Sequence, residues 1–173
     1  MLVETRGCRI FLSVLADRVG ISQSYVHRFF PTKADLVRAL AERWFAEVEA
    51  ASTAALARDL PPDERLEQWV LAILRVKRDR YDADPALFLA YLDLAGDHGD
   101  LVATHVRRLS RALESILRDM VRPDRLADSL ALVEDATTLF RVPHDIARFR
   151  PRATDDRARA VVRAVALALR RHP

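Results

Sequence analysis

Hydrophobic residues recur every three or four positions along almost the whole chain, which is the spacing of helices with one apolar face. Breaks in this pattern coincide with residues that end or cap helices, such as the prolines at 61–62 and the two glycines of segment 96–100. No sustained alternation of hydrophobic and polar residues marks a strand, so the pattern predicts an all-α fold. Beyond residue 32, a helix is expected from 33 to about 59, and a second from the break at prolines 61–62 to about 81. A short helix is expected from 84, and longer ones over about 102–121, 126–140 and 154–171.

The stretch of residues 12–36 predicts two short helices joined by a tight turn. Its first apolar residues fall on one helical face, and Gly20 follows them, where a helix end favours a left-handed residue. Ser22 can cap the second helix, which Pro31 ends. The residues at 32–35, Thr-Lys-Ala-Asp, have the form of a capping box and therefore begin a third helix.

Two short helices around a glycine turn, the second with a polar outer face, are the arrangement that reads the DNA major groove. The sequence ADRVGISQSYVHRFFPTKADL at residues 16–36 also resembles the helix-turn-helix of tetracycline-repressor-type (TetR family) transcriptional regulators. The resemblance implies that the second helix faces DNA and that the lysine after it holds a phosphate. In one departure, His27 stands where the family usually has tyrosine, so an imidazole would replace a phenol at the phosphate. The residues expected to bind DNA are Ser22, Gln23, Ser24, Tyr25, His27, Arg28, Phe29 and Lys33.

The segment that precedes this motif, residues 1–11, is shorter than the full helix found there in the resembling family. We expect either that the natural chain starts earlier or that the DNA-binding unit is incomplete, and the intact motif favours an earlier start. The resemblance places a domain boundary inside the long third helix. It implies a helix-turn-helix DNA-binding domain over residues 1–46, with its first helix short or missing, and a larger helical ligand-binding and dimerisation domain over residues 47–173.

Composition places the chain among soluble globular proteins, since half of the residues are apolar and 31% are charged. No apolar run approaches the ~18 residues of a membrane span, and charges interrupt the first ten residues, where a secretory signal would be apolar. The single cysteine, Cys8, excludes an internal disulfide and suits a reducing cytoplasm. We therefore expect a cytoplasmic protein with no membrane partner, and the abundant arginine and alanine are typical of a GC-rich bacterial genome.

Motifs for phosphate binding, nucleophilic catalysis and metal-dependent hydrolysis are absent, so the sequence predicts neither an enzyme nor a cofactor. The best candidate for a metal site is the segment 97–100, Asp-His-Gly-Asp, together with His105. Its spacing matches no metal site known to us, so a polar loop beside a histidine is the favoured interpretation.

His105 lies on the apolar face of its predicted helix, where a histidine is either a hydrogen-bonded core residue or a ligand contact. Aromatic residues at helical spacing are equally open to two interpretations, a simple core or the wall of a pocket for a small apolar effector. The residues expected to line such a pocket are Trp69, Phe88, Tyr91, His105 and Phe140.

The last two predicted helices carry small apolar residues on more than one face, so they need cover from two sides. A second subunit would supply the outer cover, and the resemblance implies a homodimer through a four-helix bundle of these helices. The function expected is a DNA-binding transcriptional regulator, a ligand-responsive repressor that binds operator DNA as a dimer. The alternative is a helical ligand-binding or interaction protein that has lost DNA binding with its first helix.

Overall fold

The computed structural model describes residues 22, 24, 28–96 and 98–171, so most of the expected helix-turn-helix lies outside the described residues. All the regular secondary structure of the described part is helical and none is a strand, which confirms the predicted fold class. None of its helices is both long enough and apolar enough to cross a bilayer.

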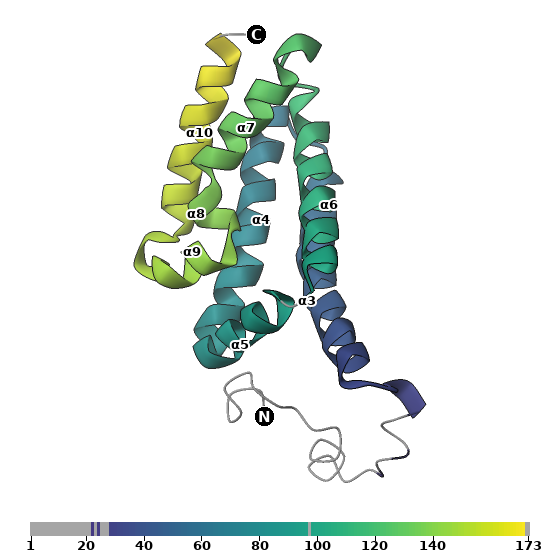
Figure 1. The fold of residues 1–173 in the computed structure, drawn as a ribbon. Helices are drawn as coiled ribbons and strands as arrows, with labels where there is room; N and C mark the ends of the chain where they lie inside the picture. The colour runs from purple at the N-terminus through teal and green to yellow at the C-terminus, as the bar shows by residue number, and fades with distance from the viewer. Residues whose placement is uncertain (1–21, 23, 25–27, 97, 172–173) are drawn as a thin grey trace.

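A central helix, α4, organises the fold, because it packs against most of the other helices (Figure 1). Helices α3 and α6 lie side by side on one flank of α4, whereas α7 and α10 pack together on the other. The elements are α3 (Lys33–Leu56), α4 (Pro62–Ala83), α5 (Pro85–Gly96), α6 (Gly99–Leu117), the 3-10 helix η1 (Pro123–Arg125), α7 (Leu126–Ala136), α8 (Thr138–Arg141), α9 (Pro143–Arg148), the 3-10 helix η2 (Arg150–Arg152) and α10 (Asp155–Arg171).

Helix α3 begins at the capping box that the sequence predicts. The Thr32 hydroxyl accepts a hydrogen bond from the Asp35 backbone N–H (3.2 Å), and the Asp35 carboxylate accepts one from the Thr32 backbone N–H (2.9 Å). The Thr32 hydroxyl also donates to this carboxylate at 2.7 Å. From this start α3 runs without a break through the domain boundary expected at residues 46–47.

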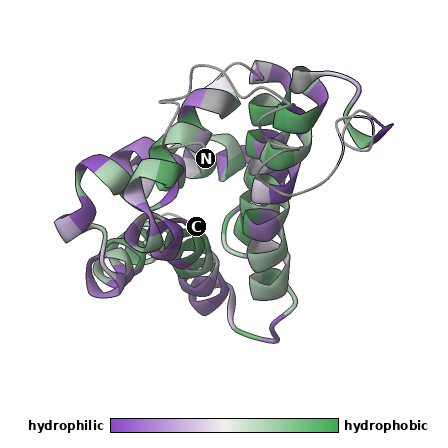
Figure 2. Ribbon diagram, turned by 90° about the horizontal axis from the view of Figure 1, so that it is seen from below, coloured by the Kyte–Doolittle hydropathy of each residue, from purple (hydrophilic) through white to green (hydrophobic). Residues whose placement is uncertain are grey.

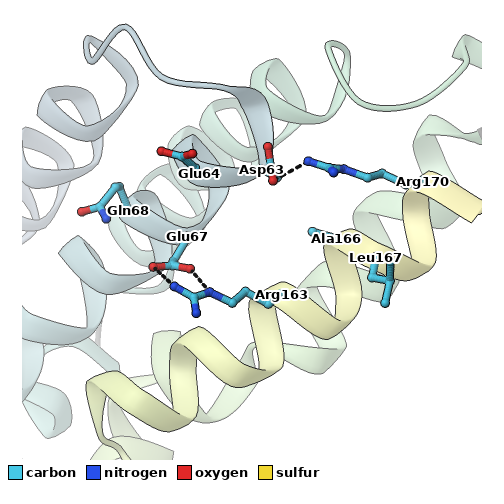
Figure 3. A pocket seen from close by; sticks show the side chains of 8 residues that line it. All are labelled: Asp63, Glu64, Glu67, Gln68, Arg163, Ala166, Leu167 and Arg170. Atoms are coloured by element: carbon cyan, nitrogen blue, oxygen red, sulfur yellow. Dashed lines mark hydrogen bonds and ion pairs between the residues drawn. The ribbon is translucent and has the colours of Figure 1, made fainter.

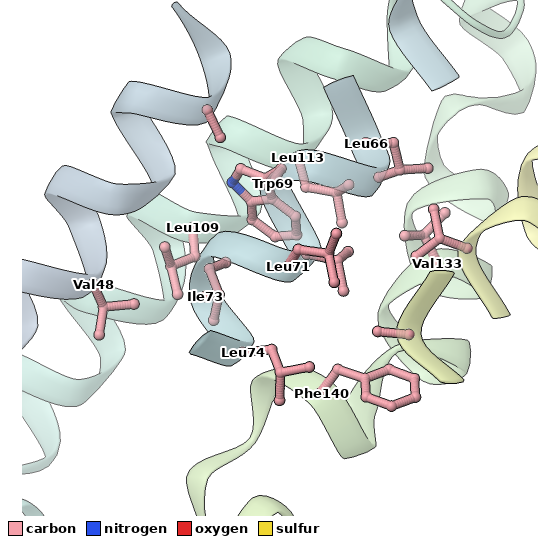
Figure 4. Packing of buried hydrophobic residues seen from close by; sticks show 14 of the residues in the cluster. Val48, Leu66, Trp69, Leu71, Ile73, Leu74, Leu109, Leu113, Val133 and Phe140 are labelled. Carbon is pink, nitrogen blue, oxygen red and sulfur yellow. The ribbon is translucent and has the colours of Figure 1, made fainter. Parts of the chain in front are cut away.

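The main core gathers around Trp69 of α4, whose ring is fully buried among leucine, isoleucine and valine side chains (Figure 4). Its indole N–H donates to the Ser52 hydroxyl of α3 at 2.7 Å, so the one polar atom of the ring is satisfied. A smaller core joins α3 to α5 through Leu36, Val37 and Ala90. Each helix carries both hydrophobic and hydrophilic residues, as amphipathic helices around a shared core require (Figure 2).

Between residues 126 and 153 the helices differ from those predicted. The single helix expected over 126–140 is divided into α7 and α8 at Thr137. The Thr137 hydroxyl donates to the Val133 carbonyl at 2.6 Å, a hydrogen bond that competes with the regular helical pattern and bends helices. Pro143, which follows the end expected for this helix, begins the additional short helix α9.

Candidate ligand-binding site

A cavity of about 480 Å³ lies between α3, α6 and the short helices α8 and α9. Most of its wall is apolar, and a few charged and polar side chains enter from α4, α6, α7, α8 and α9. This composition is typical of small-molecule sites. The lining residues are Trp44, Phe45, Val48, Lys77, Leu92, Ala95, Gly96, Val102, His105, Val106, Leu109, Glu134, Asp135, Thr138, Arg141, Val142, Pro143 and His144.

Lys77 is the most unusual member of this wall, because it is a buried cation with a relative exposure of 6%. It follows Trp69 and Ile73 at intervals of four residues and so continues the core-facing stripe of α4. Its ammonium group donates to the backbone carbonyl of Arg141 at 2.5 Å. Burial, reinforced by the positive charge of Arg141, lowers the pKa of Lys77 to about 7.

Arg141 is a second, half-buried cation in the same wall. Its guanidinium donates to the Thr137 hydroxyl (2.8 Å) and to the Glu134 backbone carbonyl (3.0 Å), and it lies 5.8 Å from the centre of the Trp69 ring. Burial lowers its pKa, although a guanidinium stays charged at neutral pH. Within the described part of the chain, neither Lys77 nor Arg141 forms an ion pair with a carboxylate.

His105 joins this wall from α6. Its Nδ1 lies 2.9 Å from Oε1 of Glu49, whose other oxygen accepts from Arg108 at 2.8 Å. Its ring stacks on Phe45, with ring centres 4.4 Å apart. Burial lowers the pKa of His105, and the hydrogen bond to Glu49 offsets part of this shift. In the neutral imidazole Nδ1–H therefore donates to Glu49, and Nε2 is left as a hydrogen-bond acceptor.

The structure brings only one of the five expected pocket residues, His105, to this cavity. Phe88 and Tyr91 instead line a smaller hollow of about 300 Å³ between α3 and α5, where both contact Trp44. Trp69 and Phe140 are fully buried in the main core and line neither space.

Lys77 and Arg141 were not predicted from the sequence as site residues. A signal for Lys77 was available, since a lysine on the core-facing stripe of an amphipathic helix must be buried, paired or functional. No comparable signal marked Arg141, because its position beside Lys77 depends on the break at Thr137.

A groove of about 510 Å³ between α4 and α10 is lined by charged residues (Figure 3). Arg163 and Arg170 of α10 reach across it and form ion pairs with Glu67 and Asp63 of α4. These charges satisfy one another near the surface, so the groove is a weaker candidate for a ligand site than the apolar cavity.

The expected DNA-binding residues are described only in part. Ser22, Ser24, Arg28 and Phe29 are exposed, and Phe29 has a relative exposure of 58%. Lys33 is the first residue of α3, whereas Gln23, Tyr25 and His27 lie outside the described residues.

The described side chains of the candidate metal segment do not converge on one point. The carboxylate of Asp100 accepts from Arg38 at 3.0 Å, His105 contacts Glu49, and Asp97 lies outside the described residues. The described residues contain no group of three or more side chains suited to hold a metal ion.

Comparisons with known proteins agree with this architecture. A family model described as the tetracyclin repressor-like C-terminal domain matches residues 62–162, more than half of the chain. The crystal structure of a TetR family transcriptional regulator, PfmR from Thermus thermophilus, matches with a TM-score of 0.62 and 20% sequence identity. The match covers 99% of this chain and 93% of that one, and at this identity it establishes the fold alone. A comparison with curated proteins found no match.

Proposed function

This chain belongs to the TetR family of transcriptional regulators, and on that premise we propose that it is a ligand-responsive repressor of the bacterial cytoplasm that binds operator DNA as a homodimer. One observation supports the proposal most strongly: helix α3 runs from the segment that resembles a DNA-reading helix to the wall of the cavity. It follows directly on the segment that resembles a DNA-reading helix, and its residues Trp44, Phe45 and Val48 form one wall of the cavity. A ligand that displaces this wall would therefore also displace the start of α3, to which the proposed DNA-reading segment is joined.

Two polar contacts support this coupling, because they tie α3 to α6 on either side of Phe45. Near the start of both helices Arg38 donates to Asp100 at 3.0 Å, and farther along Glu49 contacts His105. Since His105 and Phe45 also line the cavity, a bound ligand contacts both members of the α3–α6 pair. A shift of α3 against α6 would change the spacing of two recognition helices in a dimer.

The exposed Arg28 and Phe29 support the proposed DNA surface, since residues that contact DNA must be accessible in the free protein. An arginine on this face can bind a phosphate or a guanine edge. The full set proposed to contact operator DNA remains Ser22, Gln23, Ser24, Tyr25, His27, Arg28, Phe29 and Lys33.

The proposed dimer interface lies on the outer faces of α7 and α10, the last two long helices, which pack side by side (Figure 1). Leu132 of α7 and Leu167 of α10 have relative exposures of 45% and 52%. The small exposed residues Ala160 and Ala164 precede Leu167 on α10 and allow close approach of a second helix. Exposed leucines among alanines on adjacent helices suit a symmetric helix-bundle contact.

The proposed function is tested by a mobility-shift assay at fixed salt with DNA from upstream of the chain's own coding sequence. We expect a specific complex, because base contacts add to the salt-dependent phosphate contacts. Arg28→Ala should weaken binding by about five- to a hundredfold, since one such contact is worth ~1–3 kcal/mol. Arg111→Ala, an exposed arginine on α6, is the matched control and should leave affinity unchanged. Equal losses in the two variants, or binding no tighter than to unrelated DNA, would contradict the proposal.

A further inference from the structure

Two cations face the cavity, and among the residues that the structure places no carboxylate pairs with either of them. Lys77 is buried and donates one hydrogen bond, to a backbone carbonyl, although an ammonium group has three N–H donors. The guanidinium of Arg141 donates to a hydroxyl and to another backbone carbonyl. Buried charges are ordinarily paired, so this arrangement leaves a place for an anion.

The rest of the cavity is suited to hydrocarbon. Trp44, Phe45 and Val48 of α3 line it together with Leu92 of α5 and Leu109 of α6. An apolar body against these side chains would remove apolar surface from water, which favours binding in proportion to the area buried. A ligand that satisfies both parts of the cavity has one anionic group and one apolar body.

We propose that the cavity binds an amphipathic monocarboxylate, whose carboxylate pairs with Lys77 and Arg141 and whose hydrocarbon body lies against the apolar wall. The inference rests on the proposed function to the extent that it names the ligand class of the site coupled to α3. A carboxylate matches the planar fork of the guanidinium, and it also accepts from the remaining N–H groups of the ammonium.

The other charged groups around Lys77 do not supply the missing anion. Helix α7 contributes Glu134, whose negative charge offsets part of the lowering of the Arg141 pKa but forms no ion pair with it, and whose Oε1 accepts from the Ser110 hydroxyl at 2.7 Å. It also contributes Asp135, which forms no ion pair with either cation. On the α3 side the carboxylate of Glu49 is held by His105 and Arg108.

Two imidazoles complete the titratable groups that face Lys77. The ring of His105 comes from α6, and its lowered pKa keeps it neutral at pH 7. The ring of His144 comes from α9 and is exposed. Helix α5 adds only Leu92, Ala95 and Gly96 to the wall, so a ligand carboxylate is the anion that the cations lack.

Isothermal titration calorimetry of the whole protein with decanoate, decanol and decyltrimethylammonium tests the proposal, each ligand below its micelle-forming concentration. Decanoate should bind about ten- to a hundredfold more tightly than decanol, because hydrogen bonds to charged groups distinguish the two. Lys77→Met should remove most of this preference. The matched control Arg111→Met, an exposed cation of α6, should keep it.

Proton uptake gives a second readout that needs no variant. With its pKa at about 7, Lys77 is largely neutral at pH 8, and a bound carboxylate favours its charged form. Decanoate binding at pH 8 should therefore take up protons from the buffer, seen as an enthalpy that depends on the ionisation enthalpy of the buffer. Decanol binding should show no such dependence.

Equal affinities for decanoate and decanol, a preference for the cationic ligand, or no decanoate binding up to millimolar concentration would each overturn the proposal. Because no DNA enters these titrations, a failure here is distinct from a failure of the operator-binding assay. If Lys77→Met does not fold, the ligand comparison and the proton uptake of the unmodified protein still decide the outcome.

Discussion

Nδ1 of His105 and Oε1 of Glu49 lie 2.9 Å apart, and this contact joins the first half of α6 to the second half of α3. The carboxylate of Glu49 also pairs with Arg108, so α6 holds it from two sides. Because the stacked Phe45 and His105 both line the cavity, this contact ties the cavity wall of α6 to α3, the helix that follows the segment proposed to bind DNA.

The lowered pKa of His105 predicts a loss of stability in mild acid. The unfolded histidine binds a proton below about pH 6.5, whereas the folded one resists protonation until a lower pH. The contribution of His105 to the free energy of unfolding should therefore be complete above pH 6.5 and should be lost below it, by ~1.4 kcal/mol for each unit between the two pKa values. Urea unfolding at pH 7.5, 6.5 and 5.5 measures this slope.

Two histidine variants separate this effect from general acid sensitivity. His105→Asn keeps a hydrogen-bond donor near the position of Nδ1 and should flatten the slope. His144→Asn, at an exposed histidine, should retain it. A slope that persists unchanged in His105→Asn would assign the effect to other groups.

The lowered pKa of Lys77 predicts that the free energy of unfolding also increases with pH above neutrality. Its pKa falls from 10.5 to about 7 on folding, so unfolding between these values takes up a proton. The stability of the protein should then rise with pH from 7 to 9, with a slope of up to ~1.4 kcal/mol per pH unit. Lys77→Met should remove this rise in urea-unfolding measurements. An identical rise in the variant would show that Lys77 is not the titrating group.

Loss of the capping box should loosen the first turn of α3. Thr32→Ala removes the hydroxyl that accepts from the Asp35 N–H, and loss of such a cap typically costs ~1 kcal/mol. Faster hydrogen exchange should appear in the first turn of α3, with little change in α10. Thr53→Ala, at an exposed position inside the same helix, serves as the control. Equal exchange in the two variants would argue against a capping role.

The exposed leucines of α7 and α10 predict where a dimer can be disrupted. Leu132→Glu or Leu167→Glu should produce a folded monomer in sedimentation experiments, because each places a charge in the proposed interface. Leu89→Glu, at an exposed leucine of α5 outside that surface, should remain dimeric. Val162→Glu should instead unfold the chain, since Val162 is buried in the subunit's own core. A monomeric unmodified protein at micromolar concentration would contradict the interface.

The helices were predictable from the sequence because each one buries apolar residues that recur at helical spacing. The capping box at Thr32 and Asp35 was predictable for a related reason, since its hydrogen bonds are local. The break at Thr137 was not, because any threonine in a helix can bond to the carbonyl four residues earlier. Whether that bond bends the chain depends on packing beyond the segment.

The cavity was less predictable than the fold. The aromatic character of Trp69 and Phe140 suggested a pocket, but which side of an apolar helix faces a void is decided by how the helices pack. Lys77 and Arg141 come together from α4 and α8, 64 positions apart, and only the folded chain shows that they share one wall. The DNA-reading residues rest on the family resemblance, and their roles stay predictions.

Helix α5 is shared by two cores, since Phe88 packs in the main cluster and Ala90 packs with Leu36 and Val37 at the start of α3. The same helix gives Leu92 to the cavity wall. In evolutionary terms, the proposed function implies that ligand preference and DNA affinity cannot drift independently in such a chain. A mutation that reshapes α5 for a new ligand also repacks the first turns of α3. Lineages that change ligand are therefore expected to carry compensating substitutions at positions 36 and 37.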